Sequence, residues 1–555
     1  MTSENRNCHI CQTQFTIEPE DFIFYEKLKV PAPVNCPECR FKWRCQFRNE
    51  ITLYKRTCDL CQKSIISMYN PASPYIVYCH SCWESDKWDP NDYALDYDES
   101  KPFYDQLGEL LKKVPKKATY TSSGAGPNIN SDYTNVAGGN KNCYLIFNSG
   151  KNEDALYSRG LVSCRDSSDL YYGGEGEQSY ELINFEQTSK VAYGDHINGS
   201  FNSWFVYDIS GCSNCFGVVN ARHQKNNFFG ESLSEEEFKN RADSIKGSYA
   251  KIEETKKEFE DYALQFPRKE NHNFKAIDCT GDYIVEAKNV KESFEIMEAE
   301  KCKYIHSIKF SKDSYDSLGY GYSTELILEC VGVGYSSRVI GTYWADNCQD
   351  IGYSYAMTGS NNCFGCDGLK KASYCILNKQ YSEEEYQKIR EKIITELKQK
   401  NLYGLFMPPQ LAPFGYNETF AQNNFPITKE EAEAQGFRWE DDIHITRGQE
   451  TIKSKEIPDH IKDVSDDILK EVLACVDCGR NYRLIPAELK FYREMTIPVP
   501  RRCFQCRHQE RVKRRGPYKL FNRTCAQRTK NIKTTYAPDR PEIVYCESCY
   551  QSEVA

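Results

Sequence analysis

The stretch Cys36-Pro37-Glu38-Cys39-Arg40 completes a set of four cysteines that begins with Cys8 and Cys11, and a copy of it stands near the other end of the chain as Cys503-Phe504-Gln505-Cys506-Arg507. The two copies are 467 residues apart, and the same offset relates every other cysteine pair of the two blocks. A module of about eighty residues therefore recurs without insertion or deletion. The N-terminal block holds Cys8, Cys11, Cys36, Cys39, Cys58, Cys61, Cys79 and Cys82, and the C-terminal block holds Cys475, Cys478, Cys503, Cys506, Cys525, Cys546 and Cys549.

Two C-x-x-C pairs separated by a loop are typical of tetrahedral zinc, which four thiolates bind at about 2.3 Å per sulfur. A disulfide framework is the alternative. The chain shows no signal-peptide pattern and no apolar run long enough to span a membrane, so we expect a cytoplasmic protein with no membrane contact, in which such pairs favour metal. The sequence predicts two zinc sites in each block.

The last of these four sites is incomplete, because Arg528 stands where the N-terminal copy has Cys61. A guanidinium group cannot ligate a metal, so Cys525, Cys546 and Cys549 would need a borrowed fourth ligand. Three complete zinc sites and one eroded site are therefore expected. The solitary cysteines between the blocks, such as Cys143, are interpreted as small buried apolar residues.

The second cysteine pair of each first site leads into a predicted helix, because Pro37 suits the first helical position and no breaker follows until about Asn49. A knuckle, a hairpin and a helix that supplies the last two thiolates form a treble clef, and a plain zinc ribbon is the alternative. One face of this helix carries basic residues four apart, and the second copy repeats them. They are Arg40, Arg44 and Arg48, and then Arg507, Arg511 and Arg515, with Lys513 and Arg514 beside them.

The whole chain has a net charge of -9, yet residues 501–533 hold twelve basic residues and one glutamate. Such a stripe can follow the phosphates of DNA or RNA. We expect nucleic-acid binding through the eight basic residues of the two helices, which are Arg40, Arg44, Arg48, Arg507, Arg511, Lys513, Arg514 and Arg515. Two alternatives stay open: a solvated helix face, and docking onto an acidic surface, including the protein's own acidic middle.

A second duplication lies between the blocks, where Gly211–Gly217 is repeated by Gly359–Gly365 at an offset of 148. Each copy continues into a helix that a capping box opens, at Ser234 and at Ser382. Aromatic residues precede each helix at steps of mostly nine to fourteen residues, which indicates short strands and turns. We predict a mainly β fold with two tandem β-solenoid-like (β-helix) repeats, each closed by a helix, whose inward aromatic residues stack. An antiparallel sheet or sandwich is the alternative.

These patterns divide the chain into six predicted regions. They are a double zinc module (1–90), a connector (91–140), the first solenoid half with its helix (141–270), the second half with its helix (271–401), a second connector (402–470) and the C-terminal double zinc module (471–555).

The terminal blocks, through Cys8-x-x-Cys11, Cys36-Pro37-Glu38-Cys39-Arg40 and their C-terminal copies, resemble the zinc-ribbon or zinc-binding domain of many uncharacterised bacterial proteins. The resemblance implies zinc at the matching cysteines and a bacterial source, and it implies no known reaction. Some members carry a CoA-transferase label, which no residue pattern here supports.

No spacing of acidic or histidine residues indicates catalysis, so the sequence predicts a non-enzymatic zinc protein that binds nucleic acid through its basic ends on a β-solenoid scaffold. The alternative is a protein-interaction or assembly scaffold, with a protein partner or as a homo-oligomer, in which zinc is structural. A β-helix enzyme that acts on polysaccharide is the third interpretation.

Overall fold

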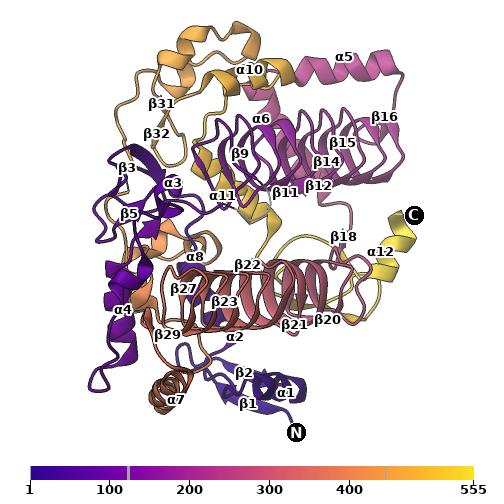
Figure 1. The fold of residues 1–555 in the computed structure, drawn as a ribbon. Helices are drawn as coiled ribbons and strands as arrows, with labels where there is room; N and C mark the ends of the chain where they lie inside the picture. The colour runs from indigo at the N-terminus through magenta and orange to yellow at the C-terminus, as the bar shows by residue number, and fades with distance from the viewer. Residues whose placement is uncertain (1, 122–125, 444, 555) are drawn as a thin grey trace.

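The computed structural model describes residues 2–121, 126–443 and 445–554, and within them the protein is mainly β with twelve α-helices. Two large sheets of predominantly parallel strands dominate the ribbon, one above the other in the view of Figure 1. The cysteine-rich modules and the connectors surround them. None of the helices in the described part of the chain is long and apolar enough to cross a membrane.

The first sheet joins strands that step along the chain by twelve residues. Ala192 lies beside Trp204, Trp204 beside Phe216, and Phe216 beside Phe228. Pairing is parallel except at the last strand. Its strands are β7 (Thr134–Asn135), β8 (Tyr144–Phe147), β9 (Glu153–Val162), β10 (Arg165–Ser168), β11 (Tyr171–Gly174), β12 (Tyr180–Glu186), β13 (Ala192–Asn198), β14 (Trp204–Ser210), β15 (Ser213–Arg222), β16 (Lys225–Phe228) and β17 (Glu231–Ser232).

The second sheet repeats this arrangement, with Gly281 beside Ser293 and Tyr343 beside Tyr355. One step is a residue longer, since Tyr315 pairs with Leu328. The parallel pairing excludes the antiparallel sheet or sandwich that was the alternative from the sequence. Its strands are β19 (Gly281–Val285), β20 (Lys288–Lys291), β21 (Ser293–Lys312), β22 (Tyr315–Tyr320), β23 (Thr324–Gly334), β24 (Ser337–Ile340), β25 (Tyr343–Asp346), β26 (Gln349–Gly352), β27 (Tyr355–Thr358), β28 (Asn361–Phe364), β29 (Ser373–Ile376) and β30 (Lys379–Gln380).

Backbone turns recur every third residue along these sheets. Tyr193, His196, Gly199, Asn202 and Phe205 all have φ between 44° and 60°. A positive φ is costly for residues other than glycine, so it persists only where surrounding bonds fix it. Neighbouring strands supply such bonds. The side-chain oxygen of a serine or an asparagine accepts a hydrogen bond from the backbone N–H twelve residues later, as Asn152 Oδ1 does from the N–H of Cys164 at 2.8 Å.

Small apolar residues and solitary cysteines form separate clusters in the sheets, as predicted. Cys143 and Cys164 belong to one cluster, and Cys363 and Cys375 to another. The prediction that aromatic residues stack on the inward side of the sheets is wrong, because the clusters between the strands consist mainly of small apolar residues and cysteines. Most of the aromatic residues lie in other clusters, shared with the helices and modules that cover the sheets.

The helices that close each half begin at the predicted serines, and both capping boxes are formed. The first predicted helix is divided into α5 (Glu235–Ile245) and α6 (Tyr249–Ala263), because Gly247 has φ 82° and Ser248 caps a new helix. The second is the single helix α7 (Glu383–Gln399).

The N-terminal module contains two short hairpins and four helices or helical turns around its cysteines. Its elements are β1 (Glu4–Asn7), β2 (Gln14–Ile17), α1 (Pro19–Lys27), α2 (Pro37–Gln46), β3 (Tyr54–Thr57), β4 (Ser64–Ser67), β5 (Val77–Tyr78), α3 (His80–Trp83) and η1 (Pro90–Tyr93). The first connector adds α4 (Phe103–Lys113) and β6 (Lys116–Lys117), and β6 pairs with β5.

The C-terminal module repeats this order. Its elements are β31 (Leu473–Ala474), β32 (Asn481–Tyr482), α10 (Pro486–Met495), α11 (Phe504–Arg515), β33 (Phe521–Thr524), β34 (Asn531–Thr534), β35 (Val544–Tyr545) and α12 (Glu547–Val554). Strand β18 (Arg268–Lys269) pairs with β35. The second connector contains η2 (Pro409–Leu411), η3 (Tyr416–Glu418), α8 (Phe420–Asn424), α9 (Lys429–Ala434), η4 (Ser454–Glu456), η5 (Ile461–Asp463) and η6 (Asp466–Lys470).

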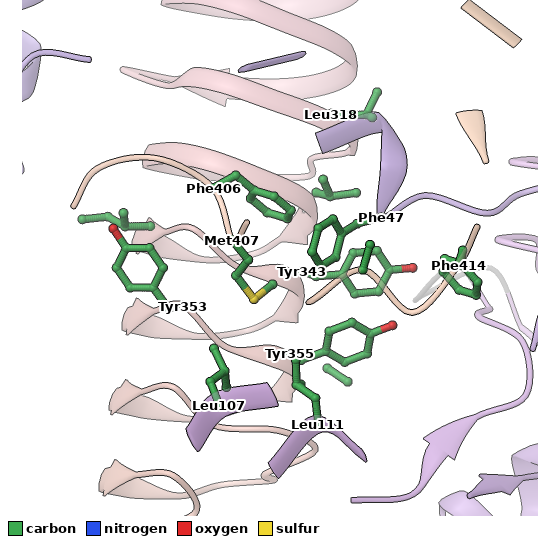
Figure 2. Packing of buried hydrophobic residues seen from close by; sticks show 14 of the residues in the cluster. Phe47, Leu107, Leu111, Leu318, Tyr343, Tyr353, Tyr355, Phe406, Met407 and Phe414 are labelled. Atoms are coloured by element: carbon green, nitrogen blue, oxygen red, sulfur yellow. The ribbon is translucent and has the colours of Figure 1, made fainter. Parts of the chain in front are cut away.

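The largest apolar core joins the second sheet to the N-terminal module and the connectors. Figure 2 shows Phe47, at the end of α2, beside Tyr343 of the sheet and Phe406 and Met407 of the second connector. The rings of Phe47 and Phe406 meet edge to face at 4.8 Å. The module is thus packed against the second sheet and is not a freely tethered end.

Candidate metal centres and their arginine clamps

The cysteines of the two blocks form four compact groups, and within each group all the sulfur atoms lie within 4.8 Å of one another. Three groups have four thiols and one has three, as the spacing predicted. The groups are Cys8, Cys11, Cys36 and Cys39; Cys58, Cys61, Cys79 and Cys82; Cys475, Cys478, Cys503 and Cys506; and Cys525, Cys546 and Cys549. These sulfur sets fit a tetrahedral soft-ligand metal such as zinc.

Each complete group begins with the same tight turn. The residue after the first C-x-x-C pair has a positive φ, 61° at Gln12, 61° at Gln62 and 69° at Gly479. Its N–H donates to the carbonyl of the first cysteine at 2.9 to 3.0 Å. This turn points two sulfurs to the same side before any metal binds.

The second pair of each first site lies at the start of a helix, as predicted. Cys36 is the N-cap of α2 and Cys503 the N-cap of α11, and the next cysteine of each pair follows in the first turn. Hydrogen bonding to Cys39 lowers the pKa of Cys36 to about 5, and the pKa of Cys39 is raised well above its usual value. Four crowded thiols cannot all ionise together, so a bound cation is what would let all four become thiolates.

The arginine stripe of α2 points into the protein. Arg40 and Arg44 lie against two carboxylates of the second sheet, Asp316 on β22 and Glu329 on β23. We call these four residues the N-terminal clamp. Arg40 donates to Asp316 at 2.8 and 3.1 Å, and Arg44 donates to Glu329 at 2.5 Å. All four side chains are at most 2% exposed.

Helix α11 forms the equivalent contact with the first sheet, using Arg507, Arg511, Asp169 and Glu181, which we call the C-terminal clamp. Arg507 donates to Asp169 at 3.0 Å, and Arg511 lies 2.9 Å from Asp169 and 3.2 Å from Glu181. One acidic residue of each clamp is matched by the 148-residue repeat, since Glu181 corresponds to Glu329, whereas Asp169 and Asp316 are 147 residues apart. Each module is therefore clamped to the sheet farther from it in the sequence.

Burial raises the pKa of one carboxyl group in each clamp. Burial raises the pKa of Glu329 to about 7, against the opposing pull of Arg44 and Arg40. Burial also raises the pKa of Glu181, which Arg511 partly offsets. Such carboxyls remain ionised only while the arginines stay beside them.

A third buried network joins the N-terminal module to the first sheet. Glu50 accepts hydrogen bonds from Arg48 at 2.5 Å and from Arg159 at 2.7 Å. Burial by itself would raise the pKa of Glu50, but Arg159 and Arg48 hold it to about 2. The N-terminal module therefore makes charged contacts with both sheets.

The predicted phosphate-binding stripe is consequently wrong for Arg40, Arg44, Arg48, Arg507 and Arg511, whose exposed fractions are 0 to 4%. A buried guanidinium that is already paired with a carboxylate is not available to neutralise a phosphate and release its counterions. The alternative of docking onto the protein's own acidic middle describes these residues correctly. Arg514 and Arg515 are half-buried, and Lys513 is exposed.

Sequence reasoning missed the partners of the arginines, although the 148-residue repeat contains a signal for them. Glu181 and Glu329 occupy equivalent positions of the two halves, just as Arg44 and Arg511 do in the modules. Matching the two repeats would have offered these pairs as candidates. Nothing local could have done so, because 285 residues separate Arg44 from Glu329.

A cavity of about 330 Å³ lies where the first sheet, α6, the start of the second sheet and the C-terminal module meet. The rings of His196, His272 and Tyr283 pack together in its wall, the two imidazoles at 3.9 Å. Oδ1 of Asp282 lies 3.1 Å from Nδ1 of His272, within hydrogen-bond distance. Burial lowers the pKa of His196 well below its usual value, so that ring is neutral at pH 7.

The comparisons with known proteins add no family. No known family matches the chain, and no curated protein matches it, so the resemblance to zinc-ribbon proteins stays a prediction. Among solved structures, one from Desulfovibrio desulfuricans G20, provisionally assigned as an acetyltransferase, is similar over 50% of this chain and 83% of its own, with 11% identity. Its TM-score of 0.11 is too low to support any argument about fold or function.

Proposed function

We propose that this protein is a non-enzymatic, zinc-stabilised assembly scaffold, in which two β-solenoids are held in a fixed arrangement by zinc modules at the two ends of the chain. The single observation that supports this most is the pair of buried clamps. Each clamp joins the helix of a predicted zinc site to the sheet that lies farther from that helix in the sequence. Pairing at twelve-residue steps, with one step of thirteen, and left-handed residues at every third position support solenoids with four short sides per coil.

Zinc has a physical role in this arrangement. A buried ion pair stabilises a fold only when its geometry is held, because each charge loses its hydration. The cysteines Cys36 and Cys39 would fix the first turn of α2, one residue before Arg40 and one helical turn before Arg44. Metal binding and clamp formation should therefore be coupled, as folding and metal binding are in small zinc domains.

Metal removal tests this proposal. Zinc content is measured by mass spectrometry on the native protein, and amide exchange is followed before and after treatment with a chelator. We expect α2, α11, β22 and β12 to lose protection together when zinc is removed. If the chain holds no zinc, or if the clamped strands keep their protection after α2 and α11 lose theirs, the proposal fails.

The cavity favours a second candidate function, the binding of a small planar ligand. Three buried nitrogen atoms beside it, Arg268 Nη1, His196 Nδ1 and His272 Nε2, have no hydrogen-bond partner within the described part of the chain. Nδ1 of His272 faces Oδ1 of Asp282 at 3.1 Å, and in the tautomer with its proton on Nδ1 the Nε2 atom presents a lone pair. A heteroaromatic ring with a donor for His272 and an acceptor for Arg268 matches this wall, and the volume is in the range of ligand pockets.

Ligand-detected NMR with the heteroaromatic probes adenine and hypoxanthine tests this candidate. We expect at least one probe to bind the native protein and to bind the His272→Phe and Arg268→Met variants at least tenfold more weakly. The idea is refuted if no probe binds, or if a bound probe is indifferent to both substitutions.

A further inference from the structure

The three-cysteine group of the C-terminal module differs from the complete sites in more than one missing sulfur. In the described part of the chain, no fourth cysteine, histidine or carboxylate joins Cys525, Cys546 and Cys549, whose side chains are buried. Arg528 occupies the position of Cys61 in the N-terminal copy and is exposed. The position that lacks a ligand therefore lies on the exposed side of the site.

The turn that carries the missing ligand is also open. At the three complete sites, the residue after the first C-x-x-C pair has a positive φ and donates its N–H to the first cysteine. Thr529 is the equivalent residue here, and among the described residues it has neither the positive φ nor that hydrogen bond. The outer bond of the turn is nevertheless kept, since Cys525 N–H donates to the Lys530 carbonyl at 2.9 Å, as Cys58 does to Lys63 at 2.8 Å.

The other half of the site is intact. Cys546 N–H donates to Cys525 Sγ at 3.2 Å, and Cys79 N–H donates to Cys58 Sγ at 3.3 Å in the N-terminal copy. Ser548 lies 3.4 Å from Cys546, as Ser81 lies 3.3 Å from Cys79. Three sulfurs are thus held as in a complete site, and the departure is confined to the fourth position.

We propose that this group is a metal site with one ligand position open to an external thiolate, and that Arg528 favours the thiolate by its charge. Three thiolates and a divalent ion carry a net charge of -1, and a fourth thiolate makes it -2, as at the complete sites. The guanidinium of Arg528 offsets that second charge. Its Nη1 lies 3.5 Å from Ser548 Oγ, at the edge of the group. Soft metals prefer sulfur ligands, and zinc sites with three protein ligands keep an exchangeable fourth position.

Binding at this position is a ligand exchange without oxidation or reduction. A thiol loses its proton to the buffer as its sulfur binds the metal, and a bound water molecule leaves. The thiol could come from a small molecule or from a cysteine of another protein, and the chemistry at the site is the same. The inference goes beyond the scaffold proposal, which rests on the three complete sites.

Cobalt substitution of the full-length protein tests this inference, because the visible bands of Co²⁺ report the number of sulfur ligands. Glutathione, a short cysteine-containing peptide and acetate are titrated separately. We expect both thiols to change the spectrum and acetate to have no effect at the same concentration. Tighter binding of the peptide would identify a protein cysteine as the source, and tighter binding of glutathione a small thiol.

The duplication provides matched variants. Arg528→Cys should restore a four-sulfur site and abolish the response to thiols, and Cys61→Arg should create a response in the N-terminal copy. Arg528→Gln keeps the position open but removes the charge, so it should weaken thiol binding about threefold to tenfold. If native protein and Arg528→Cys respond equally to thiols, the open position is refuted. If Cys549→Ser binds as much metal as the native protein, the site holds no metal, while the zinc count of the complete sites still tests the scaffold.

Discussion

Removing one arginine from the N-terminal clamp tests how the modules are held. In the native protein, two arginines face two carboxylates, and all four side chains are buried. Arg44→Met leaves Asp316 and Glu329 to share Arg40. Breaking a buried pair by removing one partner costs about 3 to 5 kcal/mol, because a charge is left without compensation.

The cost should depend on pH, and the sign follows from Glu329. Its pKa is already about 7 in the native protein, and losing Arg44 raises it further. A folded state with a raised carboxyl pKa binds protons more tightly than the unfolded state, so both proteins lose stability as pH rises above about 4.5, and above pH 7 the variant goes on losing it after the native protein has stopped. Below about pH 6 the carboxyl is protonated in both proteins, and the cost falls to the lost packing and hydrogen bonds. Between pH 7 and 8.5 the difference should grow by about 2 kcal/mol.

Amide hydrogen exchange in α2 measures this cost locally, which suits a chain too large for a single unfolding transition. A loss of about 3 kcal/mol corresponds to roughly hundredfold faster exchange. Lys513→Met, an exposed basic residue of the equivalent helix α11, is the control and should change little. Arg44→Met with Glu329→Gln restores one arginine for one carboxylate and should recover most of the protection. The reasoning is refuted if the single variant matches Lys513→Met, if its cost does not vary with pH, or if the double variant is no better.

Three further predictions follow from other contacts. Burial raises the pKa of Glu418 to about 7, and Tyr54 donates a hydrogen bond to it at 2.7 Å, so the local stability of this segment should fall by up to about 3 kcal/mol as pH rises from about 4.5 to 7, and Glu418→Gln should flatten that slope in amide exchange; an unchanged slope would contradict this assignment. Asn152→Ala leaves the Cys164 N–H buried without a partner and should cost about 2 kcal/mol in the same assay, whereas Asn202→Ala, which removes a half-buried hydrogen bond to the Asn214 side chain, should cost less. Equal costs would mean that burial does not raise the cost of losing such a bond. Charge reversal of Arg507 to Glu places three carboxylates together and should expose α11 to proteolysis rather than selectively remove a binding activity, so a protease-resistant variant would count against the clamp.

The sequence determined the local features of this protein. The four cysteine groups, the helix starts at Cys36 and Cys503, and the capping boxes at Ser234 and Ser382 all depend on residues within about thirty positions of each other. Their chemistry is local, because a knuckle turn or a helix cap forms from adjacent residues.

Only the tertiary structure decided what the arginines do. From the sequence, Arg40 and Arg44 formed a basic stripe that suited phosphate as well as it suited a carboxylate, because one helix face does not reveal what lies opposite it. Their partners Asp316 and Glu329 are more than 270 residues away and become neighbours only when α2 packs on β22 and β23. The same holds for the cavity beside His272, whose wall combines two sheets and the C-terminal module. Charge in a sequence is a property of residues, but its role depends on burial and on the opposite charge, which the chain brings together only by folding.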